Sequence, residues 1–250
     1  MNTKETLLNF LQQPLDTADG IFKIFSKLPG AQMHIGHKPG ERFLFIKGHR
    51  PDAATLVAHA DTVFEVSGEH EIVEDDDVFR SGSSCYGIGA DDRAGCAMLW
   101  LLKDMGHHIL VCDYEEGTHD DAPGCCTGSK YLMREHPEIA SVINRSCFIF
   151  EFDRRLAYAK RREHYTTYNL PVSTEFRNFI ESNTGFIDDD NTGYTDIMEL
   201  CTEVCGANIC VGYAYAHSAR EFISISAFQN TYELMIKLLS GVLRRFPLVN

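Results

Sequence analysis

Five residues that can bind metal ions recur in a fixed order along this chain, each inside its own short signature. They are His59 in His-Ala-Asp-Thr-Val, Asp91 in Gly-Ala-Asp-Asp-Arg-Ala-Gly, Glu116 in Asp-Tyr-Glu-Glu-Gly, Asp153 in Phe-Glu-Phe-Asp and His217 in Tyr-Ala-His-Ser. Two imidazoles and three carboxylates, with Glu115 as a further carboxylate, are the donor set of a two-metal hydrolytic site. Such a site constrains the fold strongly, because all five segments must reach one pocket.

The hydrophobic pattern around these motifs alternates between helical and extended segments. Helical spacing predicts two short helices within residues 1–28 and further helices near 92–105, 127–135, 174–182 and 227–244. Short apolar runs predict strands at 42–47, 55–59, 108–113, 146–151 and 208–212. Residues 66–90 are predicted to form a long surface excursion that contains only short strands. This alternation favours an α/β fold of three layers, with a mostly parallel mixed sheet and helices on both faces.

The candidate ligands stand where such a fold would gather them. His59 ends one predicted strand, Asp91 lies at a helix entrance, and Glu115 follows another strand. In open α/β sheets, ligands bind beyond the carboxyl ends of the strands. We therefore expect the five segments to meet at that edge.

Length and composition set the broader class. The chain has 250 residues, of which 44% are hydrophobic, and we expect one catalytic domain over 1–250. The net charge of −13 argues against nucleic acid as a partner, and the only basic cluster, Lys160-Arg161-Arg162, is short. The sequence predicts no membrane span and no secretory signal, and its nine cysteines fit reduced thiols, so a cytoplasmic location is expected.

The ligand types suggest a division of labour. A pair of divalent ions needs one bridging carboxylate and about two further ligands for each ion. We assign Asp91 to the bridge, His59 and Asp153 to one ion, and Glu116 and His217 to the other. Taken alone, His59 would read as an ordinary loop histidine, and only the combination of motifs favours the metal site.

Two nearby carboxylates have predicted catalytic roles. Asp61 can accept the second N–H of His59, which would fix the tautomer and raise the basicity of the metal-binding nitrogen. Glu115 is assigned as general base, which takes a proton from the attacking water and passes it to the leaving nitrogen. The glycines around Asp91 do not form a phosphate loop, because no Lys-Ser/Thr ending follows. We expect these glycines to allow the first turn of the helix to lie close to the site.

Together these motifs resemble those of the di-zinc exopeptidase and deacylase superfamily, which contains peptidase T, glutamate carboxypeptidase, acetylornithine deacetylase and the lidless aminopeptidases. The resemblance covers roughly residues 55–155 and 210–240 and assigns the same roles to the same residues. It also implies a zinc-exopeptidase-like fold and a cis peptide bond between Asp91 and Asp92. Members such as glutamate carboxypeptidase insert a lid domain before the last histidine. Here only residues 154–216 are available, so we expect no lid domain.

The sequence thus predicts a metal-dependent hydrolase of a peptide or amide bond. Two zinc ions are expected, with cobalt or manganese as alternatives. An aminopeptidase acting on small peptides is favoured, and a deacylase of N-acyl amino acids is the alternative. A phosphoesterase, or a metal-binding protein without turnover, fits less well, since binding alone would not require Glu115. The sequence leaves open whether the protein forms a homo-oligomer. Candidate substrate contacts, chosen because they neighbour the motifs, are Tyr86, Arg154, Tyr213, Tyr215 and Arg220.

Overall fold

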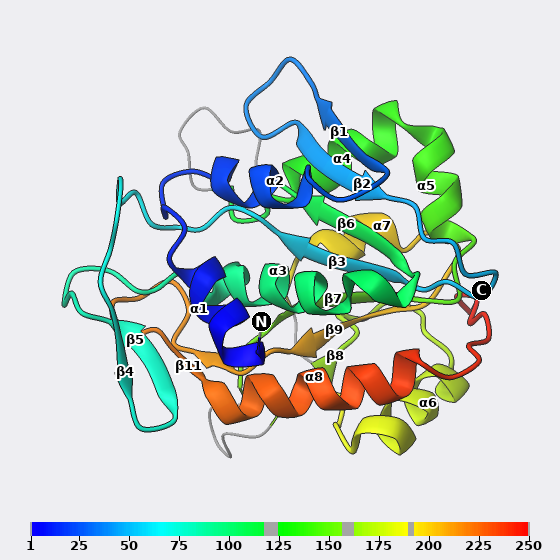
Figure 1. Cartoon of the computed structure of the whole chain (residues 1–250). Helices are drawn as coiled ribbons and strands as arrows, with labels where there is room; N and C mark the ends of the chain where they lie inside the picture. Colours follow the sequence, from blue (N-terminus) through cyan, green and yellow to red (C-terminus); the bar gives the residue numbers. More distant parts are fainter. Residues whose placement is uncertain (1, 118–124, 157–162, 190–192, 250) are drawn as a thin grey trace.

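A seven-stranded sheet forms the middle layer of the protein (Figure 1). The computed structural model describes residues 2–117, 125–156, 163–189 and 193–249. In spatial order the strands are β1 (Ala31–Ile35), β2 (Arg42–Ile46), β6 (His108–Cys112), β3 (Thr55–His59), β7 (Ile149–Arg154), β9 (Gly206–Cys210) and β8 (Tyr165–Thr166). The central strands β6, β3, β7 and β9 run parallel, whereas β1, β2 and β8 are antiparallel to their neighbours. The predicted mostly parallel mixed sheet is confirmed.

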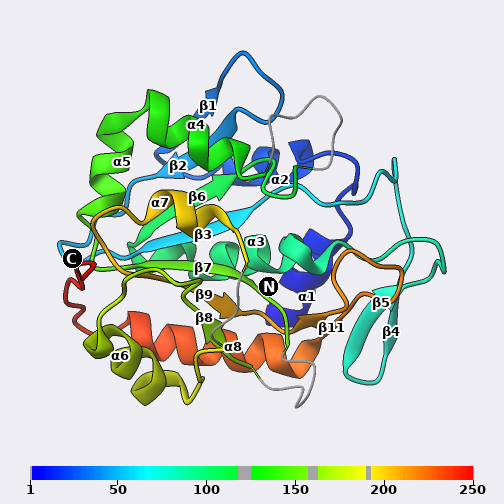
Figure 2. The same cartoon turned by 180° about the vertical axis from the view of Figure 1, so that it is seen from behind.

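Helices cover both faces of this sheet, as Figures 1 and 2 show from opposite sides. One face packs against α1 (Thr3–Leu11), α2 (Asp19–Phe25), α3 (Ala90–Leu102), α6 (Thr174–Thr184) and α8 (Ile225–Leu239). The other packs against α4 (Thr127–Glu135), α5 (Pro137–Asn144) and α7 (Asp196–Leu200). A short 3-10 turn, η1 (Lys103–Met105), follows α3. The three-layer arrangement expected from the sequence is therefore present.

The middle strand β3 shows why the sheet must be covered twice. All five of its residues are buried. Leu56 and Ala58 belong to the core on the α3 side, whereas Val57 belongs to the core on the α7 side. Successive side chains of a strand point to opposite faces, so a continuous apolar run is stable only between two layers of helices.

A second, smaller sheet carries one of the candidate ligands. It contains β4 (Ile72–Asp75), β5 (Val78–Ser81), β10 (Tyr213–Ala214) and β11 (Phe222–Ser224), in the order β10-β11-β5-β4. The β4–β5 hairpin is the main structure within the predicted surface excursion. Its strand β5 pairs with β11, and the loop between β10 and β11 contains His217. This sheet lies at the left end of the molecule in Figure 1.

Several element boundaries differ from the sequence predictions. Strand β7 runs over Ile149–Arg154 rather than 146–151, so Asp153 lies inside it, and α8 ends at Leu239 rather than at 244. The sequence did not predict β1, β8, β10, β11, α5 or α7. The basic cluster Lys160-Arg161-Arg162 lies outside the described residues.

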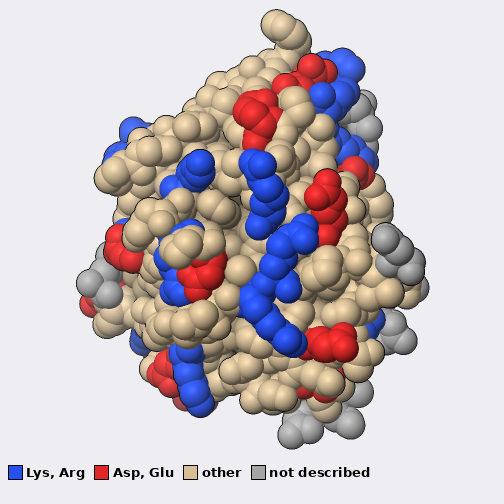
Figure 3. Space-filling view, turned by 90° about the vertical axis from the view of Figure 1, so that its right-hand side faces the viewer, with Lys and Arg blue, Asp and Glu red and all other residues tan. Residues whose placement is uncertain are grey.

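Positive charge gathers on one face of this acidic protein. Lys and Arg side chains form a band across the face on the right-hand side of Figure 1, where the parallel strands begin (Figure 3). Lys47, Arg50 and Arg145 line a shallow pocket in the segments that precede these strands. The candidate ligands lie at the opposite ends of the strands, about 16 Å away for a five-residue strand, so this surface charge is largely screened from them. Within the described ranges, no helix is both long and apolar enough to cross a bilayer. The cytoplasmic location stays a prediction.

Candidate metal centre

Three parallel strands end at one edge of the sheet and bring four of the predicted residues together. His59 is the last residue of β3 and is fully buried. Asp153 lies next to the last residue of β7, and Glu115 and Glu116 follow the end of β6. Because β3, β6 and β7 are parallel, their carboxyl ends meet at the same place.

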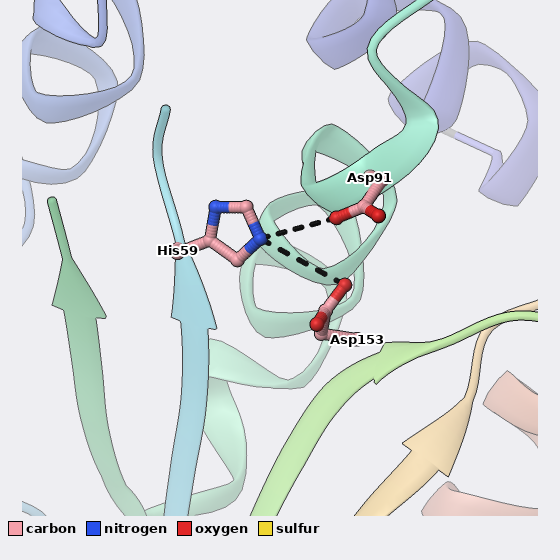
Figure 4. A group of neighbouring side chains, drawn as sticks. All are labelled: His59, Asp91 and Asp153. Carbon is pink, nitrogen blue, oxygen red and sulfur yellow. Dashed lines mark hydrogen bonds and ion pairs between the residues drawn. The ribbon is translucent and has the colours of Figure 1, made fainter. Parts of the chain in front are cut away.

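A first group of donors centres on His59. Its Nε2 lies 3.2 Å from Asp91 Oδ1 and 3.8 Å from Asp153 Oδ1 (Figure 4). The two carboxylates point toward the imidazole from the start of α3 and from β7. One donor atom from each of the three residues lies within 4.8 Å of the others. These are the residues that the sequence assigned to one ion.

A second group shares Asp91 with the first. His217 Nε2 lies 3.2 Å from Asp91 Oδ2 and 2.7 Å from Glu116 Oε1. The two oxygens of Asp91 thus face two different histidines, as a bridging carboxylate would. Glu115 also lies close, with Oε2 4.0 Å from His59 Nε2. The structure brings all six predicted donor residues to one place.

Asp61 connects His59 to the Glu115–Glu116 turn. Its Oδ1 lies 3.2 Å from His59 Nδ1 and accepts a hydrogen bond from the backbone N–H of Glu115 at 3.1 Å. Its Oδ2 accepts from the N–H of Glu116 at 3.2 Å. The carboxylate therefore orients the imidazole, leaves Nε2 facing the site and fixes the adjacent turn.

The start of α3 is held by a carboxylate that sequence reasoning missed. Glu221 is buried, and its side chain accepts hydrogen bonds from the N–H groups of Ile88, Gly89 and Asp91. Gly89 has φ 64°, a left-handed conformation that glycine adopts without steric cost. Glu221 lies outside the five motifs, and nothing in the sequence distinguished it from a surface acid in the loop after His217.

Next to Asp91, a second aspartate organises the backbone. The peptide bond between Asp91 and Asp92 is cis, as the resemblance implied. Asp92 Oδ2 accepts from the N–H of His59 at 3.2 Å, and Oδ1 accepts from the N–H of Gly95 at 2.8 Å. A Cβ at Gly95 would collide with the Asp92 carboxylate and with the carbonyl oxygen of Phe152. The expected close approach of the helix start is confirmed at this glycine.

Burial and neighbouring charges shift the pKa values of the clustered side chains. Burial, reinforced by neighbouring carboxylates, raises the pKa of Glu115 and of Asp153 well above the usual carboxyl value. The same causes raise the pKa of Glu116 to about 7. Hydrogen bonds to two carboxylates raise the pKa of His217 to about 11. Burial opposes a charge on His59, but the surrounding carboxylates outweigh it and its pKa is raised too. Asp91 differs: burial alone would raise its pKa, but hydrogen bonds from His217 and His59 hold the pKa well below the usual carboxyl value.

This donor set fits divalent cations. Buried carboxylates that repel one another would be stabilised by ions of charge 2+, and imidazole nitrogen with carboxylate oxygen suits zinc, cobalt or manganese. Asp91 can face both ions, with His59 and Asp153 on one side and Glu116 and His217 on the other. The metal identity, the number of ions and each ligand role are taken up below as proposals.

A cavity of about 270 Å³ opens over the candidate ligands. Arg154 and Tyr213, two of the predicted substrate contacts, line it. Tyr86 and Tyr215 do not, and Arg220 lines a separate pocket beside β5. The Tyr213 hydroxyl donates to Asp153 Oδ1 at 2.9 Å, so this residue also orients a candidate ligand.

The fold is one that solved aminopeptidases share. Aminopeptidase PepT from Bacillus cereus superposes with a TM-score of 0.65 at 14% identity, covering 97% of this chain and 99% of that chain. A tripeptidase from Staphylococcus aureus gives a TM-score of 0.63 at 11% identity, covering 96% and 98%. For the TET1 peptidase from Pyrococcus horikoshii the TM-score is 0.61 at 12% identity, covering 97% and 100%.

At these identities the likeness establishes the fold. The predicted zinc-exopeptidase-like α/β architecture is confirmed, and the described residues between β7 and His217 form no lid domain. No protein-family model and no curated protein match the sequence. The TET1 peptidase can assemble into a tetrahedron or a large octahedral shell. Self-association of the present chain stays a prediction.

Proposed function

We propose that this protein is a metal-dependent aminopeptidase acting on small peptides. The observation that carries the proposal is the placement of Asp91 between His59 and His217, with one carboxylate oxygen facing each imidazole. The aminopeptidase fold and the small open cavity over the donors support it. We further propose zinc as the metal and two ions as the complement.

Bound divalent ions would polarise the scissile carbonyl and promote ionisation of a water molecule. The remaining work belongs to side chains of this chain. Asp61 holds His59 so that Nε2 faces the carboxylates of Asp91 and Asp153. Tyr213 holds Asp153 through its hydroxyl. Both contacts fix ligand positions before substrate arrives, which avoids reorganisation during the reaction.

Glu115 is the proposed general base. It lines the cavity next to Glu116, and its side chain is 8% exposed, so it can reach the reacting atoms from the protein interior. Water attacks the carbonyl carbon while Glu115 takes one of its protons. The same carboxyl group then gives the proton to the leaving nitrogen, the C–N bond breaks, and a carboxylate and an amine are released.

Replacement of Glu115 by Gln tests this assignment. We expect a loss of peptide hydrolysis of at least about 100-fold, because general-base catalysis contributes on that order. Bound zinc, measured by mass spectrometry after reconstitution, should be unchanged. The exposed acid Glu135, which pairs with Arg134, provides a matched Glu135→Gln control with wild-type turnover.

The substrate set should contain aminoacyl amides, dipeptides and N-acetyl amino acids, each with zinc, cobalt or manganese supplied. Cleavage of free-amino substrates alone supports the aminopeptidase. Cleavage of N-acetyl amino acids alone would replace it with a deacylase. Unchanged turnover in Glu115→Gln would remove the proposed base.

A further inference from the structure

The hydrolytic step does not use Arg154, although its side chain lines the cavity and is only 9% exposed. We infer that Arg154 is the specificity-determining residue through which this cleft recognises a carboxylate on its substrate. The inference rests on the function proposed above, and it assigns to that site a substrate class defined by negative charge near the scissile bond.

A register shift in the sheet turns Arg154 toward the cavity. In a regular strand, consecutive side chains point to opposite faces. The pairing of β7 with β9 shifts between Glu151 and Arg154, and both Asp153 and Arg154 line the same cavity. Such irregularities commonly re-aim side chains beside active sites. Arg154 therefore lines the cavity together with its sequence neighbour Asp153, a candidate metal ligand.

The surrounding residues fix the guanidinium and leave one nitrogen for a ligand. Nε donates to His164 Nε2 at 3.2 Å, and Nη2 donates to Asp189 Oδ2 at 3.0 Å. The group also stacks over Tyr168 at 5.8 Å from the ring centroid. Within the described parts of the chain, Nη1 makes no hydrogen bond. This nitrogen is not fully buried, so a ligand in the cavity can reach it, and a carboxylate is the acceptor whose geometry suits a guanidinium.

The charge balance of the site points the same way. Asp91, Glu115, Glu116 and Asp153 supply four carboxylates, which two divalent ions would neutralise in full. Arg154 adds a positive charge to the same cavity lining. Asp189 offsets part of this positive charge. The arginine side of the loaded site would thus attract an anionic group.

Two parts of a peptide can present that carboxylate. One is the free C-terminus of a short peptide, and the other is an acidic side chain. The cavity of about 270 Å³ is slightly smaller than the usual range for ligand sites, roughly 300–1,000 Å³. A short substrate therefore brings either group within reach of Arg154. The experiment below distinguishes the two sources.

The test compares matched substrates on zinc-loaded wild-type protein and on Arg154→Gln. One pair is Leu-Gly and Leu-Gly amide, and the other is Glu-Gly amide and Gln-Gly amide. We expect the wild type to prefer the carboxylate member of one pair by about 10- to 100-fold in kcat/KM, the range for a charge-assisted hydrogen bond. In Arg154→Gln this ratio should fall close to one, while Arg154→Lys keeps part of it. The surface control Arg134→Gln should retain the wild-type ratio.

Binding calorimetry with the same substrates on zinc-loaded Glu115→Gln, with and without Arg154→Gln, gives a readout independent of turnover. Equal wild-type affinity and equal kcat/KM within both pairs, or an unchanged preference in Arg154→Gln, would overturn the inference. Carboxylate-selective binding without cleavage of any substrate would overturn the proposed function and leave the inference standing. The double variant Arg154→Gln/Asp189→Asn removes both partners of the ion pair, so a loss of selectivity there, with a wild-type circular dichroism spectrum, excludes misfolding as the cause.

Discussion

Replacing Asp61 by Asn should weaken metal binding without removing a ligand. The Asp61 carboxylate contacts His59 Nδ1 at 3.2 Å and the N–H groups of Glu115 at 3.1 Å and Glu116 at 3.2 Å. An asparagine keeps one acceptor oxygen, but its amide NH2 would face the N–H of Glu116. One donor is then left unpaired in a site where the Asp61 side chain is only 14% exposed.

The size of the effect follows from this lost acceptor. Leaving a buried donor unsatisfied costs about 1–3 kcal/mol, and loss of an outer carboxylate typically lowers metal affinity about 10- to 100-fold. These two estimates agree, because each factor of ten corresponds to about 1.4 kcal/mol. We expect the larger loss for the ion held by His59, and a lower kcat because the Glu115 turn is no longer fixed.

Competition titration of zinc against a chelating dye measures both affinities. Asp104→Asn is the matched control, since that carboxylate is 85% exposed and pairs only with Lys103 among the described residues. Zinc affinities of Asp61→Asn within twofold of wild type at both sites would refute the assigned role of Asp61.

Two further predictions concern carboxylates outside the cluster of candidate ligands, one at the start of α3 and one in an ion pair on the face where the parallel strands begin. Glu221→Gln should lower the free energy of unfolding by about 1–3 kcal/mol in urea titrations, because the N–H of Asp91 would face an amide NH2; an unchanged midpoint would contradict the capping role. For Asp52, hydrogen bonds from Arg50 and from the N–H of Leu243 hold the pKa well below its usual value of about 3.9. Stability from a depressed carboxyl pKa is present above the unfolded pKa and is lost as the pH falls. Asp52→Asn should therefore cost about 1 kcal/mol at pH 7 and progressively less below about pH 4, and an equal cost at both pH values would argue against this ion pair.

The convergence of the ligand segments could be predicted, because each candidate ligand lies next to a strand or helix that the local sequence pattern indicates. His59 ends an apolar run that had to be a buried strand, and Asp91 opens a helix with clear periodicity. The Glu115–Glu116 turn follows another continuous apolar run. Parallel strands bring such ends together whatever the rest of the chain does, so the site could be assembled without knowing the strand order.

Features that depend on distant partners could not be predicted in this way. Strand β7 continues past residue 151, the predicted end, and there the backbone N–H of Asp153 donates to the side chain of Asn208, 55 positions away. Helix α8 stops at Leu239, whose carbonyl oxygen accepts from Arg50, a residue 189 positions away. The role of Glu221 could not be predicted, because its carboxylate reaches the start of α3 only through the pairing of strands in the second sheet.

The most direct test of this account is the anomalous diffraction of a zinc-loaded crystal, collected on both sides of the zinc absorption edge. We predict two zinc peaks that share Asp91, one bound by His59 and Asp153 and the other by Glu116 and His217. A single peak, or zinc bound away from Asp91, would contradict the proposed two-metal site.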